Sequence, residues 1–171
     1  MNNYIICVAT ELEKKALVPE EYWDKTILTG IGIGNAMKAV KRINEERIPP
    51  KAIINIGYAG AKGITKGTVC YADYCRTYQV HDIEQLSFML CTPITDIPYY
   101  DCYTSTDFVE SSNIEGPFLV DMELLAYSIS NYDVFSIKVV SDNMDMNDYD
   151  NALKDDYTKE VKKALKEILG D

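Results

Sequence analysis

The chain has 171 residues, enough for one domain with a substantial core, and its 47% apolar and 26% charged residues are ordinary for a globular protein. A net charge of −10 disfavours nucleic acid or an anionic membrane as a partner. The N-terminus, MNNYIICVATELEKK, has no basic region, and its apolar run is too short for a signal peptide. No stretch is long enough to span a membrane.

The number and spacing of the cysteines and the histidine indicate whether the chain binds a metal and in which cellular compartment it works. There are five cysteines, an odd number, with no C-x-x-C pair, and one histidine. This pattern predicts neither a disulfide framework nor a zinc site, so we expect no metal, no cofactor and a reducing cytoplasm. Cys7 lies in an apolar, strand-like run, and we expect it to be a plain core residue.

Taken in chain order, the first third of the sequence alternates strands and helices. Continuous β-branched runs predict strands buried on both faces, and apolar residues at helical spacing predict amphipathic helices. The second helix carries Ala36, Val40 and Ile43 on one face and ends before Pro49-Pro50. The elements expected here are a strand over 4–10, a helix over 11–17, a strand over 26–30, a helix over 35–47 and a strand over 52–61.

The remainder of the chain continues the alternation after a longer strand. We expect a strand over 67–81, irregular structure over 82–103, a short strand running into a helix over 116–130, a strand over 134–142 and a helix over 148–169. No repeat, low-complexity tract or linker interrupts the pattern. The sequence therefore predicts a single α/β domain over residues 1–171, with helices on both sides of a mixed or mostly parallel sheet.

The stretch ILTGIGIGNAMKAV resembles a nucleotide-binding loop, because Gly30, Gly32 and Gly34 follow a strand and precede a helix. The spacing is G-x-G-x-G, whereas a dinucleotide loop needs G-x-G-x-x-G and a later acidic residue. A phosphate loop needs G-K-[ST], and this chain has Gly34-Asn35-Ala36. What remains is a glycine turn at the end of a strand, a common small-ligand site in α/β proteins.

Polar residues also follow the other predicted strands. Ligands of open α/β sheets bind beyond the carboxyl ends of the strands. Each acid alone is better explained as a helix cap, but together they suggest a site for a neutral or cationic, hydroxyl-rich ligand. The residues at these ends are Glu11 and Glu13, then Tyr58, then Asp121, Met122 and Glu123, and finally Ser141 and Asp142.

Five segments in order match motifs of one superfamily. They are VATELEKKAL, TGIGIGNA, AIINIGYAGAKGITKGTVCYAD, VDMELLA and KVVSDNMD. Through them the chain resembles the nucleoside phosphorylase/nucleosidase superfamily, and most closely the 5′-methylthioadenosine/S-adenosylhomocysteine nucleosidases, in a shortened form. The resemblance implies a three-layer α/β/α fold with a mixed central sheet, of the phosphorylase/hydrolase type. It also implies that the glycine turn, including Gly32, belongs to a ribosyl pocket.

The resemblance further implies the roles of an N-glycosidase. Asp142 matches the acid that protonates the purine, with Ser141 orienting it. Glu13 matches the glutamate that takes a proton from water, with Glu11 as an alternative register. Glu123 matches the glutamate that accepts hydrogen bonds from the ribose hydroxyls, beside Met122, which packs on the sugar.

Four more residues complete the implied substrate site. Phe108 is similar to the phenylalanine that stacks on the purine, and the Val109 backbone would read the base edge. Tyr58 stands where the family has a small serine, and it would fill part of the water or phosphate position. Lys138 replaces the arginine of the R-x-[IV]-S-D motif, keeping the charge without the bidentate fork.

Three readings of the activity stay open. A nucleosidase acting on a methylthioadenosine-like nucleoside is favoured over a phosphorylase, because Asn55 stands where phosphorylases usually carry an arginine. A nucleoside-binding or base-binding protein without turnover is the third reading, and Tyr58 favours it. The resemblance implies a homodimer and a small-molecule nucleoside substrate.

Overall fold

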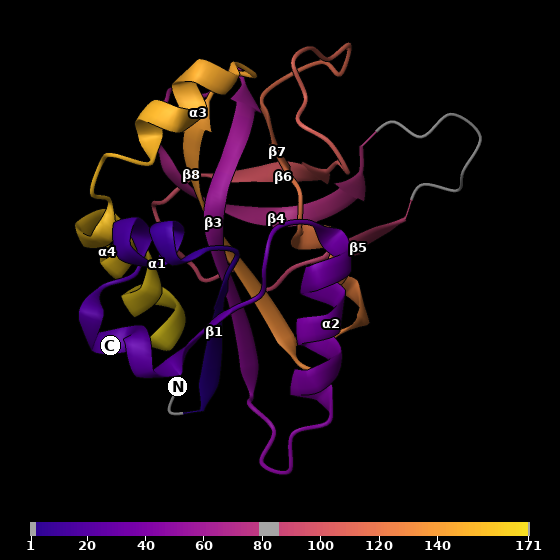
Figure 1. The fold of residues 1–171 in the computed structure, drawn as a ribbon, viewed down its shortest axis with the longest axis vertical. Helices are drawn as coiled ribbons and strands as arrows, with labels where there is room; N and C mark the ends of the chain where they lie inside the picture. The colour runs from indigo at the N-terminus through magenta and orange to yellow at the C-terminus, as the bar shows by residue number, and fades with distance from the viewer. Residues whose placement is uncertain (1–2, 79–85, 171) are drawn as a thin grey trace.

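The computed structural model describes residues 3–78 and 86–170 (Figure 1). The strands are β1 Tyr4–Val8, β2 Thr26–Leu28, β3 Ala52–Lys62, β4 Val69–Thr77, β5 Ser87–Met89, β6 Tyr99–Thr104, β7 Phe118–Asp121 and β8 Asp133–Asp142. The helices are α1 Glu11–Leu17, α2 Ile33–Asn44, α3 Met146–Ala152 and α4 Thr158–Leu169, with 3₁₀ helices η1 Glu20–Lys25 and η2 Leu124–Ile129. No helix among the described residues is long and apolar enough to cross a membrane.

The strands form one mixed sheet, which confirms the predicted α/β class. Strand β3 lies parallel to β1 and β8, and β1 lies parallel to β2. The long β3 pairs with β1 through its first half and with β7 through its last residues, while β8 runs along its other edge. Strands β8, β4, β6 and β7 then pair in turn and return to β3, so this part of the sheet closes like a barrel.

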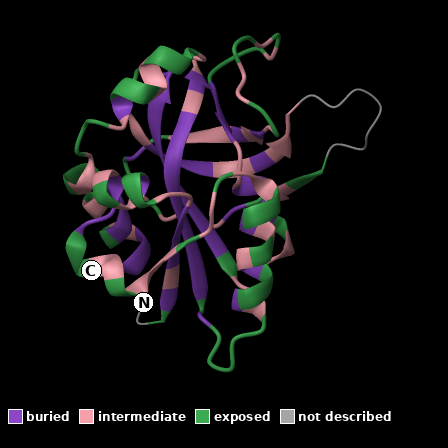
Figure 2. Cartoon of the chain, viewed as in Figure 1, coloured by how far each residue is buried: buried purple, intermediate pink, exposed green. Residues whose placement is uncertain are grey.

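Helices pack on both sides of the sheet, and β3 between them is almost entirely buried (Figures 1 and 2). Helix α4 buries Val161 and Leu165 in one apolar cluster together with Leu17 of α1. Helix α2 buries Ala36, Val40 and Ile43, the face predicted from its periodicity, in the other cluster. Cys7 is fully buried in that second cluster, as expected of a core residue.

Three expectations about local structure need correction. The region expected to be irregular contains β5 and β6, which are specified by pairing with β4 and β7 rather than by their own sequence pattern. The expected helix over 148–169 is two helices, and the break is stabilised by Asp156, whose carboxylate accepts a hydrogen bond from the Thr158 N–H (2.9 Å). The expected helix after β7 is 3₁₀ rather than α. Residues 79–85, expected as the end of a strand and the start of a loop, lie outside the described residues.

The pairing brings distant segments to one edge of the sheet. Gly60 of β3 pairs with Val120 of β7 on one side and with Asp142 of β8 on the other. Strand β1 ends at the same edge, because it lies parallel to β3. The segments that follow β1, β7 and β8 are therefore neighbours around the last residues of β3.

Candidate active site

A cavity of about 350 Å³ opens at this edge of the sheet. Its walls are mostly apolar, and its polar side chains are mainly carboxylates, which enter from different segments. The lining residues are Ala9, Glu13, Ile31, Tyr58, Ala59, Gly60, Asp107, Phe108, Val109, Val120, Asp121, Met122, Glu123, Ser141, Asp142, Met146 and Tyr149.

Glu13 is both a helix-capping residue and a buried acid of the cavity. Its Oε2 accepts hydrogen bonds from the N–H and hydroxyl of Thr10 (3.0 and 3.1 Å), and the Thr10 hydroxyl in turn accepts one from the Glu13 N–H. Its Oε1 accepts a hydrogen bond from the Tyr58 N–H at 3.4 Å. Burial raises the pKa of Glu13, and the hydrogen bonds and Lys138 oppose that rise. The capping box thus fixes α1 and directs the second carboxylate oxygen toward β3.

Glu123 is fixed by the glycine turn. Its Oε1 accepts a hydrogen bond from the Gly32 N–H at 2.7 Å. Gly30 and Gly32 have φ values of +84° and +89°, a conformation open to glycine, which lets the chain turn back against the cavity. Burial, reinforced by the charge of Asp121, raises the pKa of Glu123 to about 7.

Asp142 ends β8 and is held at both carboxylate oxygens. Oδ2 accepts a hydrogen bond from the Ser141 hydroxyl (2.6 Å), and Oδ1 accepts one from the Met144 N–H (2.8 Å). Its carboxylate lies against Gly60, where an added Cβ would come within 3.0 Å of Oδ1. The absence of a side chain at Gly60 therefore makes room for the acid.

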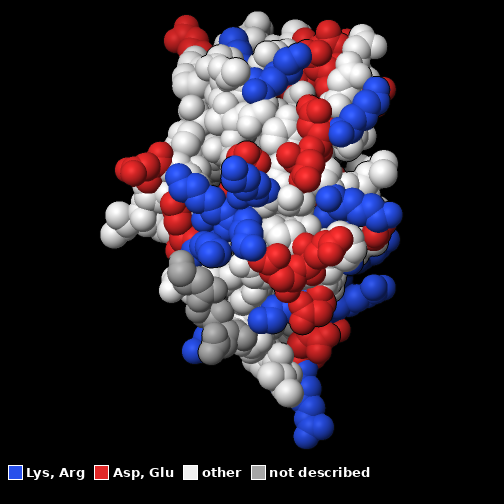
Figure 3. All heavy atoms as spheres, turned by 90° about the vertical axis from the view of Figure 1, so that its left-hand side faces the viewer, with Lys and Arg blue, Asp and Glu red and all other residues white. Residues whose placement is uncertain are grey.

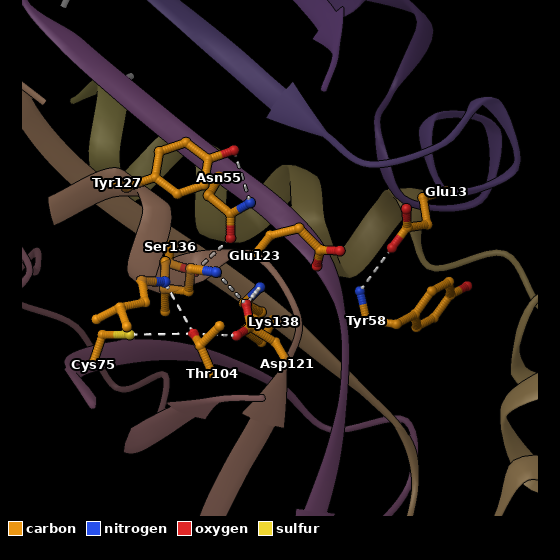
Figure 4. A network of polar contacts seen from close by, with 12 residues as sticks. Glu13, Asn55, Tyr58, Cys75, Thr104, Asp121, Glu123, Tyr127, Ser136 and Lys138 are labelled. Carbon is orange, nitrogen blue, oxygen red and sulfur yellow. Dashed lines mark hydrogen bonds and ion pairs between the residues drawn. The ribbon is translucent and has the colours of Figure 1, made fainter. Parts of the chain in front are cut away.

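A buried ion pair lies behind the cavity wall (Figure 4). Lys138 Nζ contacts Asp121 Oδ2 at 2.7 Å, and both side chains are essentially inaccessible to solvent. Asp121 also accepts hydrogen bonds from the Thr104 hydroxyl and the Leu124 N–H. Burial lowers the pKa of Lys138, but the charge and hydrogen bond of Asp121 together with the neighbouring Cys102 and Glu123 outweigh burial, and the net shift is upward. Lys138 is thus a buried cation paired with Asp121.

Tyr58 lines the cavity, but its hydroxyl points to the helix that covers one side. The hydroxyl donates a hydrogen bond to the Ala152 carbonyl of α3 at 3.1 Å. Its ring meets Tyr149 and Tyr157 edge-on, with centroids 6.3 and 6.2 Å apart. Asn55, in contrast, does not line the cavity. Its amide is hydrogen-bonded to Ser136 and Tyr127, so it offers no contact there.

The structure brings most of the predicted site residues together. Eight of them line the one cavity: Glu13, Tyr58, Phe108, Val109, Met122, Glu123, Ser141 and Asp142. Gly32 and Lys138 are not on its surface, since Gly32 acts by its hydrogen bond to Glu123 and Lys138 is buried behind Asp121. Glu11, the alternative to Glu13, is an exposed residue paired with Lys15.

Met146 and Tyr149 of α3 also line the cavity and were missed. Their only signal in the sequence was their closeness to Asp142; Met146 fell between two expected elements, and Tyr149 fell near the start of the long helix expected over 148–169. Among residues 3–78 and 86–170, no group of three or more His, Cys, Asp or Glu side chains could hold a metal ion. No lysine or arginine is among the described lining residues of the cavity.

Several solved nucleosidase structures have a similar fold. The 5′-methylthioadenosine/S-adenosylhomocysteine nucleosidase of Neisseria meningitidis, in complex with methylthio-immucillin-A, matches with a TM-score of 0.77 and 20% identity over 99% of each chain. A putative enzyme of the same name from Francisella philomiragia matches with a TM-score of 0.77 and 14% identity, over 98% of this chain and 99% of that one. This chain has the nucleosidase fold.

A third nucleosidase structure has a similar fold. The S-adenosylhomocysteine nucleosidase of Streptococcus pyogenes, in complex with 5-methylthiotubericidin, matches with a TM-score of 0.73 and 17% identity, over 99% of this chain and 97% of that one. No family model and no curated protein matches the sequence. The similarity of this chain to the nucleosidases is therefore seen in the arrangement of its helices and strands, while the overall sequence identity is low.

Proposed function

We propose that the protein is a purine nucleoside N-ribosylhydrolase that cleaves the N-glycosidic bond of a methylthioadenosine-like nucleoside. The observation that carries this proposal is the meeting of Glu13, Glu123 and Asp142 in one mostly apolar cavity. These carboxylates come from α1, the segment after β7, and the end of β8. In this proposal the whole chain is a single three-layer α/β/α domain that carries the active site.

Asp142 has the surroundings that a positioned acid needs. Cleavage builds positive charge on the ribose, and the purine leaves readily only when its N7 is protonated. With both oxygens of Asp142 anchored by Ser141 and Met144, its carboxyl group has a fixed orientation toward a bound base. Phe108 and Val109 line the same cavity and supply an apolar surface for that base.

In the proposed reaction, Glu13 activates the attacking water and Glu123 binds the ribose hydroxyls. Burial raises the pKa of Glu13, so its carboxylate is a stronger base toward a bound water than an exposed glutamate. Glu123 is oriented by the Gly32 N–H and offers its other oxygen to the ribose hydroxyls. Met122, beside it in the wall, provides packing for the sugar.

Hydrolysis is favoured over phosphorolysis by the charge of the cavity. Binding phosphate requires cationic or N–H donors. Lys138 acts on Glu13 and Glu123 through its charge, but it does not line the cavity and is paired with Asp121. Asn55 is hydrogen-bonded to Tyr127 and Ser136 and does not face the cavity, so its identity does not decide between water and phosphate. Acidic and basic side chains are interspersed on the face in Figure 3.

A binding protein without turnover is the second candidate, supported by Tyr58. Tyr58 and Glu13 both line the cavity, and the Tyr58 N–H donates to the Glu13 carboxylate, so the Tyr58 ring would narrow the space for a water activated by Glu13. A panel of purine nucleosides, assayed for released base with and without phosphate, separates the three readings. The proposal expects release of base that is independent of phosphate. Phosphate-dependent release with ribose 1-phosphate indicates a phosphorylase, and binding without release indicates the binder.

The proposal includes two features of the protein beyond its active site. It expects a homodimer, which light scattering at working concentration tests directly. It also expects the reducing cytoplasm as the working compartment, and the five cysteines of the described chain are all free.

A further inference from the structure

The cavity has two flanks that come from opposite sides. Figure 1 shows α3 on one side of the end of β3 and the loop between β6 and β7 on the other. Phe108 and Val109 line the cavity from the loop, whereas Met146 and Tyr149 line it from α3. If the base of a nucleoside lies against the loop, its ribose extends toward α3.

Tyr149 is a hydroxyl donor without a partner in this cavity. Among the described residues its hydroxyl makes no hydrogen bond, although the side chain is half-buried and lines the cavity. Its ring is held by the edge-on contact with Tyr58 (84° between the planes), and Tyr58 is bonded to the carbonyl of Ala152 in the same helix. The side chain is therefore positioned by the fold, yet its polar atom is unused.

The charges around Tyr149 keep it a donor. Burial, followed by the charges of Glu13, Glu123 and Asp142, raises the pKa of Tyr149 to about 12. The phenol thus stays protonated at neutral pH among side chains that can mainly accept. Ribose hydroxyls at the 2′ and 3′ positions are donors that suit those carboxylates. A phenol donor instead suits an acceptor of the sugar.

Besides the 2′ and 3′ hydroxyls, which the carboxylates already bind, a nucleoside sugar offers two further acceptors, the ring oxygen and the heteroatom of the 5′ substituent. A hydrogen bond donated to the ring oxygen opposes the positive charge that develops there during cleavage. A bond to the 5′ heteroatom has no such cost. We propose that Tyr149 contacts the substrate by donating a hydrogen bond to its 5′ heteroatom, and so selects nucleosides with an oxygen or sulfur at that position.

This inference rests on the proposed nucleosidase function. The variant to test is Tyr149→Phe, which keeps the ring and its contact with Tyr58. The matched control is Tyr157→Phe, because Tyr157 meets Tyr58 in the same way but does not line the cavity, and its hydroxyl faces Asp155. Three substrates differ at the 5′ position: adenosine, 5′-methylthioadenosine and 5′-deoxyadenosine.

The value of kcat/KM should fall about 3- to 10-fold for adenosine in Tyr149→Phe, as expected for one neutral hydrogen bond. The loss should be smaller for methylthioadenosine, because a thioether sulfur is a weak acceptor, and absent for 5′-deoxyadenosine. Tyr157→Phe should change none of the three. An equal loss for all substrates, or no loss for any, would overturn the assignment.

The two proposals fail in different ways. If the unmutated protein releases no base from any nucleoside, the nucleosidase function fails. The 5′ contact is then read from dissociation constants measured by calorimetry with the same substrates and variants. If the unmutated protein is active but Tyr149→Phe has the unmutated selectivity, only the 5′ contact fails.

Discussion

The substitution Gly60→Ala tests how the acid is placed without touching the acid itself. A Cβ at Gly60 would lie 3.0 Å from Asp142 Oδ1 and 3.6 Å from its Cγ. The φ of Gly60 is not positive, so alanine brings no backbone strain of that kind. The carboxylate must move by a few tenths of an ångström against its hydrogen bonds to Ser141 and Met144. Because displacements near 1 Å cost up to about 10²-fold in rate, we expect a loss of about 10-fold in kcat.

Steady-state assays of base release measure this loss, and KM should change less than kcat. The control is Gly34→Ala, since Gly34 lies in α2 with open space at its Cβ and does not line the cavity. In an Asp142→Asn background, Gly60→Ala should lose little further activity, because both changes act on one group. Full additivity of the two substitutions, or an unchanged rate in Gly60→Ala, would refute the reasoning.

Two further predictions concern stability. Lys138→Met leaves Asp121 buried and unpaired, and it should lower the free energy of unfolding by about 3–5 kcal/mol in chemical denaturation. Lys66→Met breaks a more exposed ion pair and should lower that free energy by less than about 1 kcal/mol. Equal losses in the two variants would contradict the buried pairing. The pKa of Glu123 is raised from 4.5 to about 7, so the folded state binds more protons and stability should fall as pH rises through that window. Denaturation of Glu123→Gln at several pH values should show a smaller decline, because Glu13, whose pKa burial also raises, still contributes to it. An identical pH dependence in both proteins would count against the assignment.

The sequence predicted the parts of the fold that are specified by local pattern. Helix α2 has its expected buried face, and β3 is a buried strand at the expected place. The closure of the sheet was beyond sequence reasoning, because β3 pairs with β1 and β7 at opposite ends of one edge and with β8 along the other edge. For the same reason β5 and β6 were expected as irregular structure, since long-range pairing decides their conformation.

The candidate site was predictable where a residue follows a strand directly. Asp142 ends β8, Glu123 follows β7 after one residue, and Glu13 lies in the helix that follows β1. The structure gathers all three around one cavity. Tyr149 was not predictable, because its place depends on the break between α3 and α4. The burial of Lys138 was equally hidden, since sequence does not show that Asp121 pairs with it from another strand.

In the proposed reaction, Asp142 supplies the proton for base release. The most direct measurement compares release of adenine from methylthioadenosine by the unmutated protein and by Asp142→Asn, in phosphate-free buffer, at saturating substrate. Asparagine can still hydrogen-bond but cannot donate the proton. The account predicts a fall in turnover of about 10²–10⁴-fold, with a much smaller change in substrate affinity. Full turnover in Asp142→Asn would contradict it.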